Sequence, residues 1–155
     1  MVNAFVRSVL PGDLAYIGAH MRLADRQELE AAQGPVDPQE ALYRAVLLST
    51  SSWVLVGRSG RPFAAFGVAP LSLLDGSGLP WLLGTDEAAR EGRTLVREGR
   101  KYVPRMLEEH PHLVNYVDAR NGRSVEWLRR LGFTVHAPAP YGVAGLPFHR
   151  FEMRA

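Results

Sequence analysis

Proton transfer is the chemistry that the polar residues in the second half of the chain could best support. Tyr116 and Asp118 lie at the end of an alternating segment, HLVNYVD, and Tyr141 lies in a later loop. A phenol can give a proton to a leaving group, and a carboxylate can take one from a nucleophile. Tyr116 also has a structural interpretation as a core residue, and Tyr141 has one as a loop anchor. His136 and His149 are weaker candidates for a base, since lone histidines are usually structural.

Several other chemistries are excluded by what the sequence lacks. It contains no cysteine, which removes thiolate nucleophiles, cysteine zinc sites and disulfides. Neither a Gly-x-Ser-x-Gly motif nor a Walker phosphate loop occurs. His110 and His112 flank a proline without a third ligand nearby, so we expect a loop there and no metal site.

Length and composition indicate one soluble domain. The chain has 155 residues, of which 46% are hydrophobic, and this is enough for one core. We therefore expect a single domain over residues 1–155. The formal net charge of +2 argues against nucleic-acid binding. There is no long apolar run and no secretory signal pattern, so we expect no membrane contact and a cytoplasmic location.

Hydrophobic periodicity and turn residues predict the order of helices and strands. Asp37, Pro38 and Glu40 have the spacing of a helix start, with a cap, a first-turn proline and an acidic residue. The expected strands are 4–9, 53–56, 63–68, 81–84, 112–118, 134–137 and 148–153, and the expected helices are 14–29, 38–49, 87–110 and 122–131. This order is typical of an α/β or α+β sheet with helices on both faces.

Two helices carry more specific expectations. Asn121 is expected to cap the short helix, and Gly132 is expected to end it in a left-handed turn so that Phe133 packs at the next strand. Gly92 and Gly99 lie seven residues apart on the long helix. Each glycine costs about 1 kcal/mol of helix propensity relative to alanine. We therefore expect the sheet to approach that helix face closely.

The segment NGRSVEWLRRLGF, residues 121–133, resembles the GNAT N-acetyltransferase superfamily. In that superfamily, the segment after the fifth strand carries an asparagine, a small residue three positions on, and Gly-Phe eleven and twelve positions on. Asn121, Ser124, Gly132 and Phe133 lie at those spacings. The resemblance implies a mixed, mostly antiparallel sheet that splays between its fourth and fifth strands, and it implies acetyl-CoA as the cofactor.

A narrower resemblance covers residues 53–154. The strand ending in WLLGTD, the long basic helix, the NYV of residues 115–117 and the Asn121 segment look like a small family of internal virion proteins of short-tailed phages. Those proteins are themselves regarded as acetyltransferase-like. This resemblance implies a virion or accessory component in the host cytoplasm or packaged in a virion. Its partners would be other phage proteins or a second copy of the chain.

The superfamily resemblance also implies where acetyl-CoA would bind. The pantetheine arm would pair with the strand edge at Leu82, Leu83 and Gly84, with Asn121 and Ser124 beside it. Core packing explains the three strand residues equally well.

The phosphate signature of the superfamily, Gln/Arg-x-x-Gly-x-Gly/Ala, is absent from GTDEAAREGRT. A displaced phosphate site could form one turn later, from Arg90, Gly92, Arg93 and Thr94. Asp86 and Glu87 would repel a diphosphate there, which favours an ordinary capped helix.

The tyrosine that protonates the leaving thiolate in the superfamily is replaced by Leu128. Tyr116 or Tyr141 would have to act as the acid, and Asp118 would be the base. Two functions remain. One is an active acyl-CoA-dependent N-acetyltransferase acting on an amine of a small molecule or protein. The other is an acetyltransferase-like virion protein with weak or lost chemistry. Leu128 and the missing phosphate signature favour the second, so we expect weak or no acetyl-CoA binding.

Overall fold

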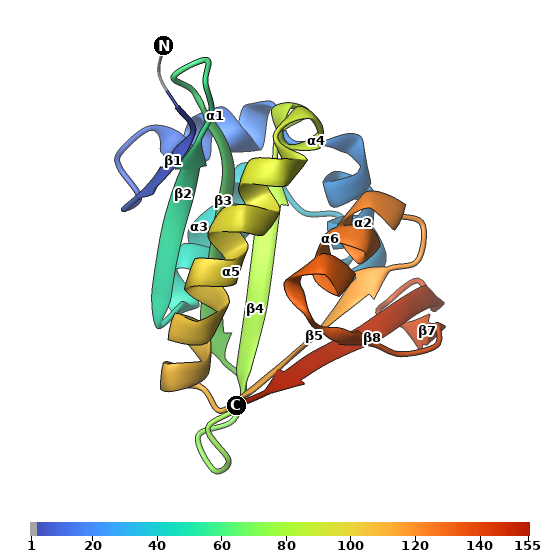
Figure 1. The fold of residues 1–155 in the computed structure, drawn as a ribbon. Helices are drawn as coiled ribbons and strands as arrows, with labels where there is room; N and C mark the ends of the chain where they lie inside the picture. The colour runs from blue at the N-terminus through green and yellow to red at the C-terminus, as the bar shows by residue number, and fades with distance from the viewer. Residues whose placement is uncertain (1–2) are drawn as a thin grey trace.

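The computed structural model describes residues 3–155 (Figure 1). The strands are β1 (Phe5–Arg7), β2 (Ser51–Val56), β3 (Pro62–Pro70), β4 (Gly78–Gly84), β5 (His112–Asp118), β6 (Thr134–Val135), β7 (Ala139–Tyr141) and β8 (Leu146–Arg154). The helices are α1 (Asp13–Ala19), α2 (Leu23–Gln33), α3 (Pro38–Leu48), α4 (Glu87–Arg90), α5 (Gly92–Glu109) and α6 (Gly122–Leu131).

The strands form one mixed sheet in the order β1-β2-β3-β4-β5-β8-β6, and β7 pairs with β8 outside this path. Neighbouring strands are antiparallel except for β4 and β5. This parallel pair meets only at Gly78 and Leu113, near the start of each strand. Figure 1 shows the two strands diverging from there towards their carboxyl ends. The predicted fold class, with its splay between the fourth and fifth strands, is confirmed.

Two apolar clusters hold helices against opposite faces of the sheet. On one face, side chains of α5 and α6, such as Val103 and Val125, pack with Phe66 and Phe151. On the other face, side chains of α1 and α3 pack on β2, β3 and β4 around Leu42. Burial of a large aliphatic or aromatic side chain contributes roughly 1.5–3 kcal/mol. These two clusters therefore fix the helix layers between which the splay opens.

Helix boundaries differ from two of the predictions. The helix predicted over 87–110 is two helices, α4 and α5, separated at Glu91, where φ is −104°. Gly92 follows this break, and glycine has low helix propensity. The helix predicted over 14–29 is α1 and α2, because Met21 between them forms an antiparallel bridge with Thr85.

The prediction that Asn121 caps α6 is wrong. The residue lies at the N-cap position, but its side chain makes no capping hydrogen bond, because contacts with residues 22–28 use both ends of its amide. Gly132 does end α6 in a left-handed conformation, with φ of 99°, and Phe133 is buried. Asp37 caps α3 as predicted, accepting the Glu40 N–H at 3.0 Å.

The glycines of α5 face a helix and not the sheet, so the predicted close approach of the sheet is wrong. A Cβ at Gly92 would lie 3.1 Å from Trp127 Nε1, and one at Gly99 would lie 2.5 Å from Leu131 Cδ2. Trp127 and Leu131 both belong to α6. The small residues therefore let α5 and α6 approach each other.

Replacing Gly67 by alanine is expected to destabilise the protein by about 1–3 kcal/mol. A Cβ at this position in β3 would collide with the Ser51 carbonyl oxygen and lie 3.0 Å from Ser52 Cα, and backbone atoms cannot move aside cheaply. Gly122→Ala is the matched control, because no atom lies within 4 Å of its added Cβ. Urea denaturation measures both changes, and equal effects of the two substitutions would contradict this account.

None of the helices within residues 3–155 combines the length and apolar character needed to cross a lipid bilayer.

Candidate active site

A cavity of about 360 Å³ lies where β4 and β5 separate. Side chains of α5 and α6 line it on one face of the sheet, and side chains of α2 and α3 line it on the other. Between them the wall is formed by residues 80–83 of β4 and 115–117 of β5. The cavity therefore reaches both helix layers through the splay, and two ligands could meet in it from opposite faces.

The backbone of β4 alternates between β3 and the cavity side. Thr85 donates to Phe63 of β3 at 2.8 Å, whereas Pro80 C=O and both backbone groups of Gly84 point the other way. By this alternation, Leu83 faces β3 and Leu82 faces the cavity. No hydrogen bond of Leu82 to β5 or to a side chain occurs within residues 3–155. Of the strand residues predicted to bind pantetheine, Leu82 thus presents free backbone groups at the splay.

Gly84 is already paired by the chain itself. Its N–H donates to Asp25 Oδ2 at 2.9 Å, and its carbonyl accepts the Arg22 N–H at 2.8 Å. The start of α2 therefore takes the position at which a ligand would pair with the end of β4. The predicted contact of Gly84 with a cofactor would need this pairing to open.

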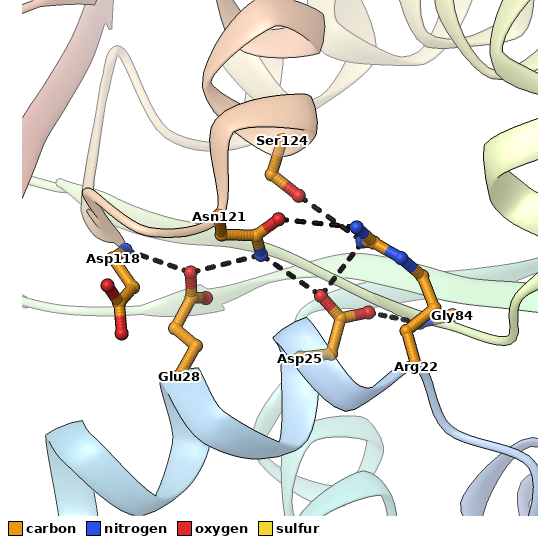
Figure 2. A network of polar contacts seen from close by, with 7 residues as sticks. All are labelled: Arg22, Asp25, Glu28, Gly84, Asp118, Asn121 and Ser124. Atoms are coloured by element: carbon orange, nitrogen blue, oxygen red, sulfur yellow. Dashed lines mark hydrogen bonds and ion pairs between the residues drawn. The ribbon is translucent and has the colours of Figure 1, made fainter.

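A buried polar network joins this end of β4 to α6, and Figure 2 shows its residues pointing towards one another. The Arg22 guanidinium donates to Asp25 Oδ1 at 3.1 Å and to Asn121 Oδ1 at 3.3 Å. It also reaches Ser124 Oγ at 3.5 Å. Arg22, Asp25 and Asn121 are only 7%, 2% and 3% exposed. Burial raises the pKa of Asp25, while the charge of Arg22 opposes this rise.

Glu28, one turn beyond Asp25 on α2, lines the cavity. Its Oε1 accepts the Asp118 N–H at 2.9 Å and the Asn121 amide at 3.3 Å. Its Oε2 has no hydrogen-bond partner within residues 3–155. Since no fully buried side-chain polar atom of those residues lacks a partner, Oε2 must be accessible from the cavity.

The environment of Glu28 shifts its proton affinity into the neutral range. Protein atoms surround most of the carboxylate, although the Glu28 side chain is partly accessible where it lines the cavity. This burial raises the pKa of Glu28 to about 7, and the charges of Asp25 and Asp118 add to the rise. The two hydrogen bonds to Oε1 oppose it. A carboxylate with a pKa near neutrality and one free oxygen is suited to act as a general base.

Asp118, the predicted base, is tied to a cation. Its carboxylate accepts three hydrogen bonds from the Arg120 side chain, the shortest at 2.7 Å, and one from the Arg120 N–H. Burial alone would raise the pKa of Asp118, but these hydrogen bonds outweigh burial and lower it. Glu28, which has no cation bound to it, is the better base.

The two predicted acids are brought together. The rings of Tyr116 and Tyr141 stack at 3.9 Å with an interplanar angle of 11°, and both line the cavity. Burial, with a contribution from Tyr116, raises the pKa of Tyr141. Leu128 also lines the cavity, on the α6 side. The residues Tyr116 and Tyr141 are therefore near the splay, although they come from different strands.

A second cleft, of about 320 Å³, lies at the start of α5. The predicted phosphate-site residues Arg90, Gly92, Arg93 and Thr94 line it together. Further arginines that sequence reasoning missed also line it, namely Arg58, Arg123 and Arg130. Within residues 3–155 the first three amides of α5 donate to no backbone or side-chain group, so they are free to bind an anion.

Acidic side chains in and beside this cleft already have partners, and two of them, Glu91 and Glu126, line the cleft itself. Glu87 accepts from the Ser59 hydroxyl at 3.0 Å, and Glu91 accepts from Thr94 Oγ1 at 3.0 Å. Glu126 pairs with Arg130 at 3.0 Å. Trp127 lines both the cleft and the cavity. An elongated ligand could therefore run from the arginines past Trp127 to the splay.

The predicted histidine candidates lie elsewhere. His136 and His112 both contact the Glu152 carboxylate on β8, at 2.6 and 2.8 Å, and His149 contacts the His136 carbonyl. None of these histidines lines the cavity. Within residues 3–155 no cluster of three or more His, Cys, Asp or Glu side chains could hold a metal ion.

Sequence reasoning missed Arg22, Asp25 and Glu28. Asp25 and Glu28 are three apart on α2, so they share a helix face, but charged residues at that spacing are typical of a solvated surface. The only local sign was the scarcity of apolar residues on α2, and this does not indicate which residues the charged side chains contact. Their partner Asn121 lies more than ninety residues away.

Comparison with known proteins gave matches in structure alone. No family model and no curated protein sequence matches the chain significantly. Among solved structures, a spermidine N-acetyltransferase from Vibrio cholerae in complex with CoA and spermine has a TM-score of 0.69 at 15% identity, covering 98% of this chain and 95% of that one.

Two further structures show the same likeness. The ribosomal-protein-S5-alanine acetyltransferase from Vibrio fischeri has a TM-score of 0.69 at 15% identity, with coverage of 99% and 94%. A GNAT-family acetyltransferase from Bacillus anthracis has a TM-score of 0.71 at 7% identity, with coverage of 99% and 95%. The chain therefore has the fold of the GNAT acetyltransferases.

Proposed function

We propose that this protein is an acyl-CoA-dependent N-acyltransferase in which Glu28 is the general base. The observation that carries the proposal is the free carboxylate oxygen of Glu28 in a cavity that passes through the splayed sheet. One face of that cavity would receive the acyl donor, and the other face would receive the amine. Glu28 stands on the amine side, on α2.

The residues present fit a CoA ester. A diphosphate would bind at the second cleft, at the start of α5. There the free amides of α5 and the guanidinium groups of Arg93 and Arg123 supply donors and positive charge. The pantetheine arm would pair with the backbone of Leu82. CoA is present in the Vibrio cholerae structure of the same fold, which supports this assignment.

A bound acyl-CoA would supply a thioester, whose acyl group reaches an amine as a C–N bond forms, the C–S bond breaks and the nitrogen loses a proton. Glu28 is placed to hold that proton on Oε2. The Leu82 N–H is placed to donate to an acyl or pantetheine oxygen. Tyr116 or Tyr141 would have to give the leaving thiolate the proton that Leu128 cannot donate.

A second function is favoured by specific departures from this chemistry. Leu128 cannot donate a proton, and Asp25 occupies the Gly84 N–H that would otherwise be open to a ligand. A protein that keeps the fold but has lost the reaction could serve as a phage virion or accessory component. It would then bind other phage proteins or a second copy of itself, in the host cytoplasm or packaged in a virion.

Calorimetric titration with acetyl-CoA separates these two functions. The sequence alone favoured weak or no binding, but with the arginine-lined cleft and the free backbone groups of Leu82 we expect a dissociation constant in the low micromolar range for the wild type. Arg93→Ala should weaken binding about tenfold, because a hydrogen bond to a charged group contributes about 1.5–3 kcal/mol. Arg26→Ala, an exposed arginine on α2 outside both cavities, should leave the affinity unchanged. Absence of heat at millimolar acetyl-CoA would favour the virion role and end the enzyme proposal.

A further inference from the structure

We propose that Asn121 is a positioning residue that holds the Glu28 carboxylate with one oxygen free in the cavity. As a statement about catalysis this rests on the proposed function, but the contact itself does not. Asn121 comes from the β5 to α6 junction, and Glu28 comes from α2 on the other face of the sheet. The amide thus spans the splay at its wide end (Figure 2).

The orientation of the Asn121 amide is forced by its partners. A guanidinium can only donate, so the amide oxygen must face Arg22, whose Nη2 lies 3.3 Å away. The amide nitrogen then faces the two carboxylates, at 3.2 Å from Asp25 Oδ1 and 3.3 Å from Glu28 Oε1. The buried Arg22 side chain therefore ensures that Asn121 presents its amide nitrogen, and not its oxygen, to Glu28.

Both donors to Glu28 act on the same oxygen. The Asp118 N–H and the Asn121 amide converge on Oε1, and this leaves Oε2 for the cavity. With Asn121 shortened, one backbone donor would remain, and rotation of the carboxylate would no longer be restrained. A donor to the ionised form also favours ionisation, so its loss makes the proton harder to release.

The charges around Glu28 make this neutral donor important. Three carboxylates meet at the site and two guanidinium groups face them, so Glu28 is the carboxylate left without a cation. Arg22 contacts Asp25, and Arg120 contacts Asp118. The charges that act on Glu28 are those of Asp25 and Asp118, and the other titratable groups that line the same cavity are Arg44, Tyr116 and Tyr141. No ion pair joins Arg44 to Glu28 within residues 3–155. Asn121 thus partly replaces the missing cation.

Carbon-13 NMR of the glutamate carboxyl groups tests the contact without needing activity. In Asn121→Ala, which leaves room for water, the apparent pKa of Glu28 should rise by about one pH unit, the equivalent of one lost hydrogen bond to a charged group. Asn121→Ser, which is milder, should show the same direction. Asn115→Ala is the control, since that cavity asparagine donates to the Pro80 carbonyl and not to Glu28.

The pH profile supplies the catalytic readout. In Asn121→Ala the rising limb of kcat should move to higher pH, so that kcat falls about fivefold at pH 7 and recovers near pH 9. A purely structural role would lower kcat equally at all pH values. An unshifted Glu28 titration in both folded variants overturns the proposal. A shifted titration in a wild type that transfers no acyl group leaves the positioning contact standing and refutes the proposed function.

Discussion

Replacing Glu28 by glutamine is expected to lower kcat for N-acyl transfer by about 10²- to 10⁴-fold, the usual contribution of a general base. Glutamine has the same shape, and its carbonyl can accept the hydrogen bonds that Oε1 now receives. The substitution therefore removes the proton-accepting group and keeps the packing. Steady-state assays with a panel of amines and acetyl-CoA would measure the effect.

The matched control is Glu30→Gln on the same helix. Glu30 is exposed and makes no side-chain hydrogen bond within residues 3–155, so kcat should not change. In the wild type, kcat should rise with pH up to the pKa of Glu28, about 7, because the ionised form is the active one. If Glu28→Gln and Glu30→Gln were equally active, the assignment of the base would be wrong.

The substitution Glu28→Gln should also stabilise the protein at alkaline pH. The pKa of Glu28 is about 7 in the folded protein against an ordinary value of 4.5, so the folded state binds the proton more tightly. Stability from this group is therefore present below pH 4.5 and is lost as pH rises to 7. Above that, Glu28→Gln should be more stable than the wild type by at most about 3 kcal/mol. Denaturation at pH 4 and pH 8 would show whether the difference appears only at the higher pH.

The second large effect is expected from Arg22→Met, which should destabilise the protein by about 3–5 kcal/mol. Arg22 and Asp25 are almost fully buried, and the guanidinium lies 3.1 Å from the carboxylate. Methionine fills much of the same volume but leaves the Asp25 charge buried and unpaired, while Asn121 loses its donor. Urea denaturation at neutral pH gives the difference.

Two further variants make this measurement specific. Arg26→Met removes an exposed arginine from α2, the helix that begins directly after Arg22, and should change stability by less than about 0.5 kcal/mol. The double variant Arg22→Met with Asp25→Leu removes both charges, and it should recover much of the loss, because no unpaired buried charge remains. A loss below 1 kcal/mol in Arg22→Met would mean that the pair is far more hydrated than its burial indicates.

Local signals were sufficient for most of the secondary structure. The strand predicted over 112–118 coincides with β5, and the cap at Asp37 and the left-handed end at Gly132 are present. Caps, turns and alternation involve residues within a few positions of one another, so the sequence carries them directly. The splayed sheet was predicted through the resemblance to the GNAT superfamily, which rests on the spacing of Asn121, Ser124, Gly132 and Phe133.

The tertiary structure decided what those elements contact. Asn121 looks like a helix cap when its neighbours in sequence are considered, yet its amide is bound by Arg22, Asp25 and Glu28. Glycines of α5 that predicted contact with the sheet instead make room for α6. Both cases depend on a partner from a distant segment, and local spacing does not identify that partner.

By itself, the sequence determined most of the order of elements and, through the family resemblance, the class of sheet, and it offered Tyr116 and Tyr141 as candidate proton donors. Which carboxylate serves as the base was decided only on folding. Asp118 and Glu28 have similar intrinsic acidity, but Asp118 acquires Arg120, two residues away, while Glu28 receives the Asp118 N–H from ninety residues away and no cation. Proton affinity follows from burial and neighbouring charge, and these arise only when α2 and β5 meet.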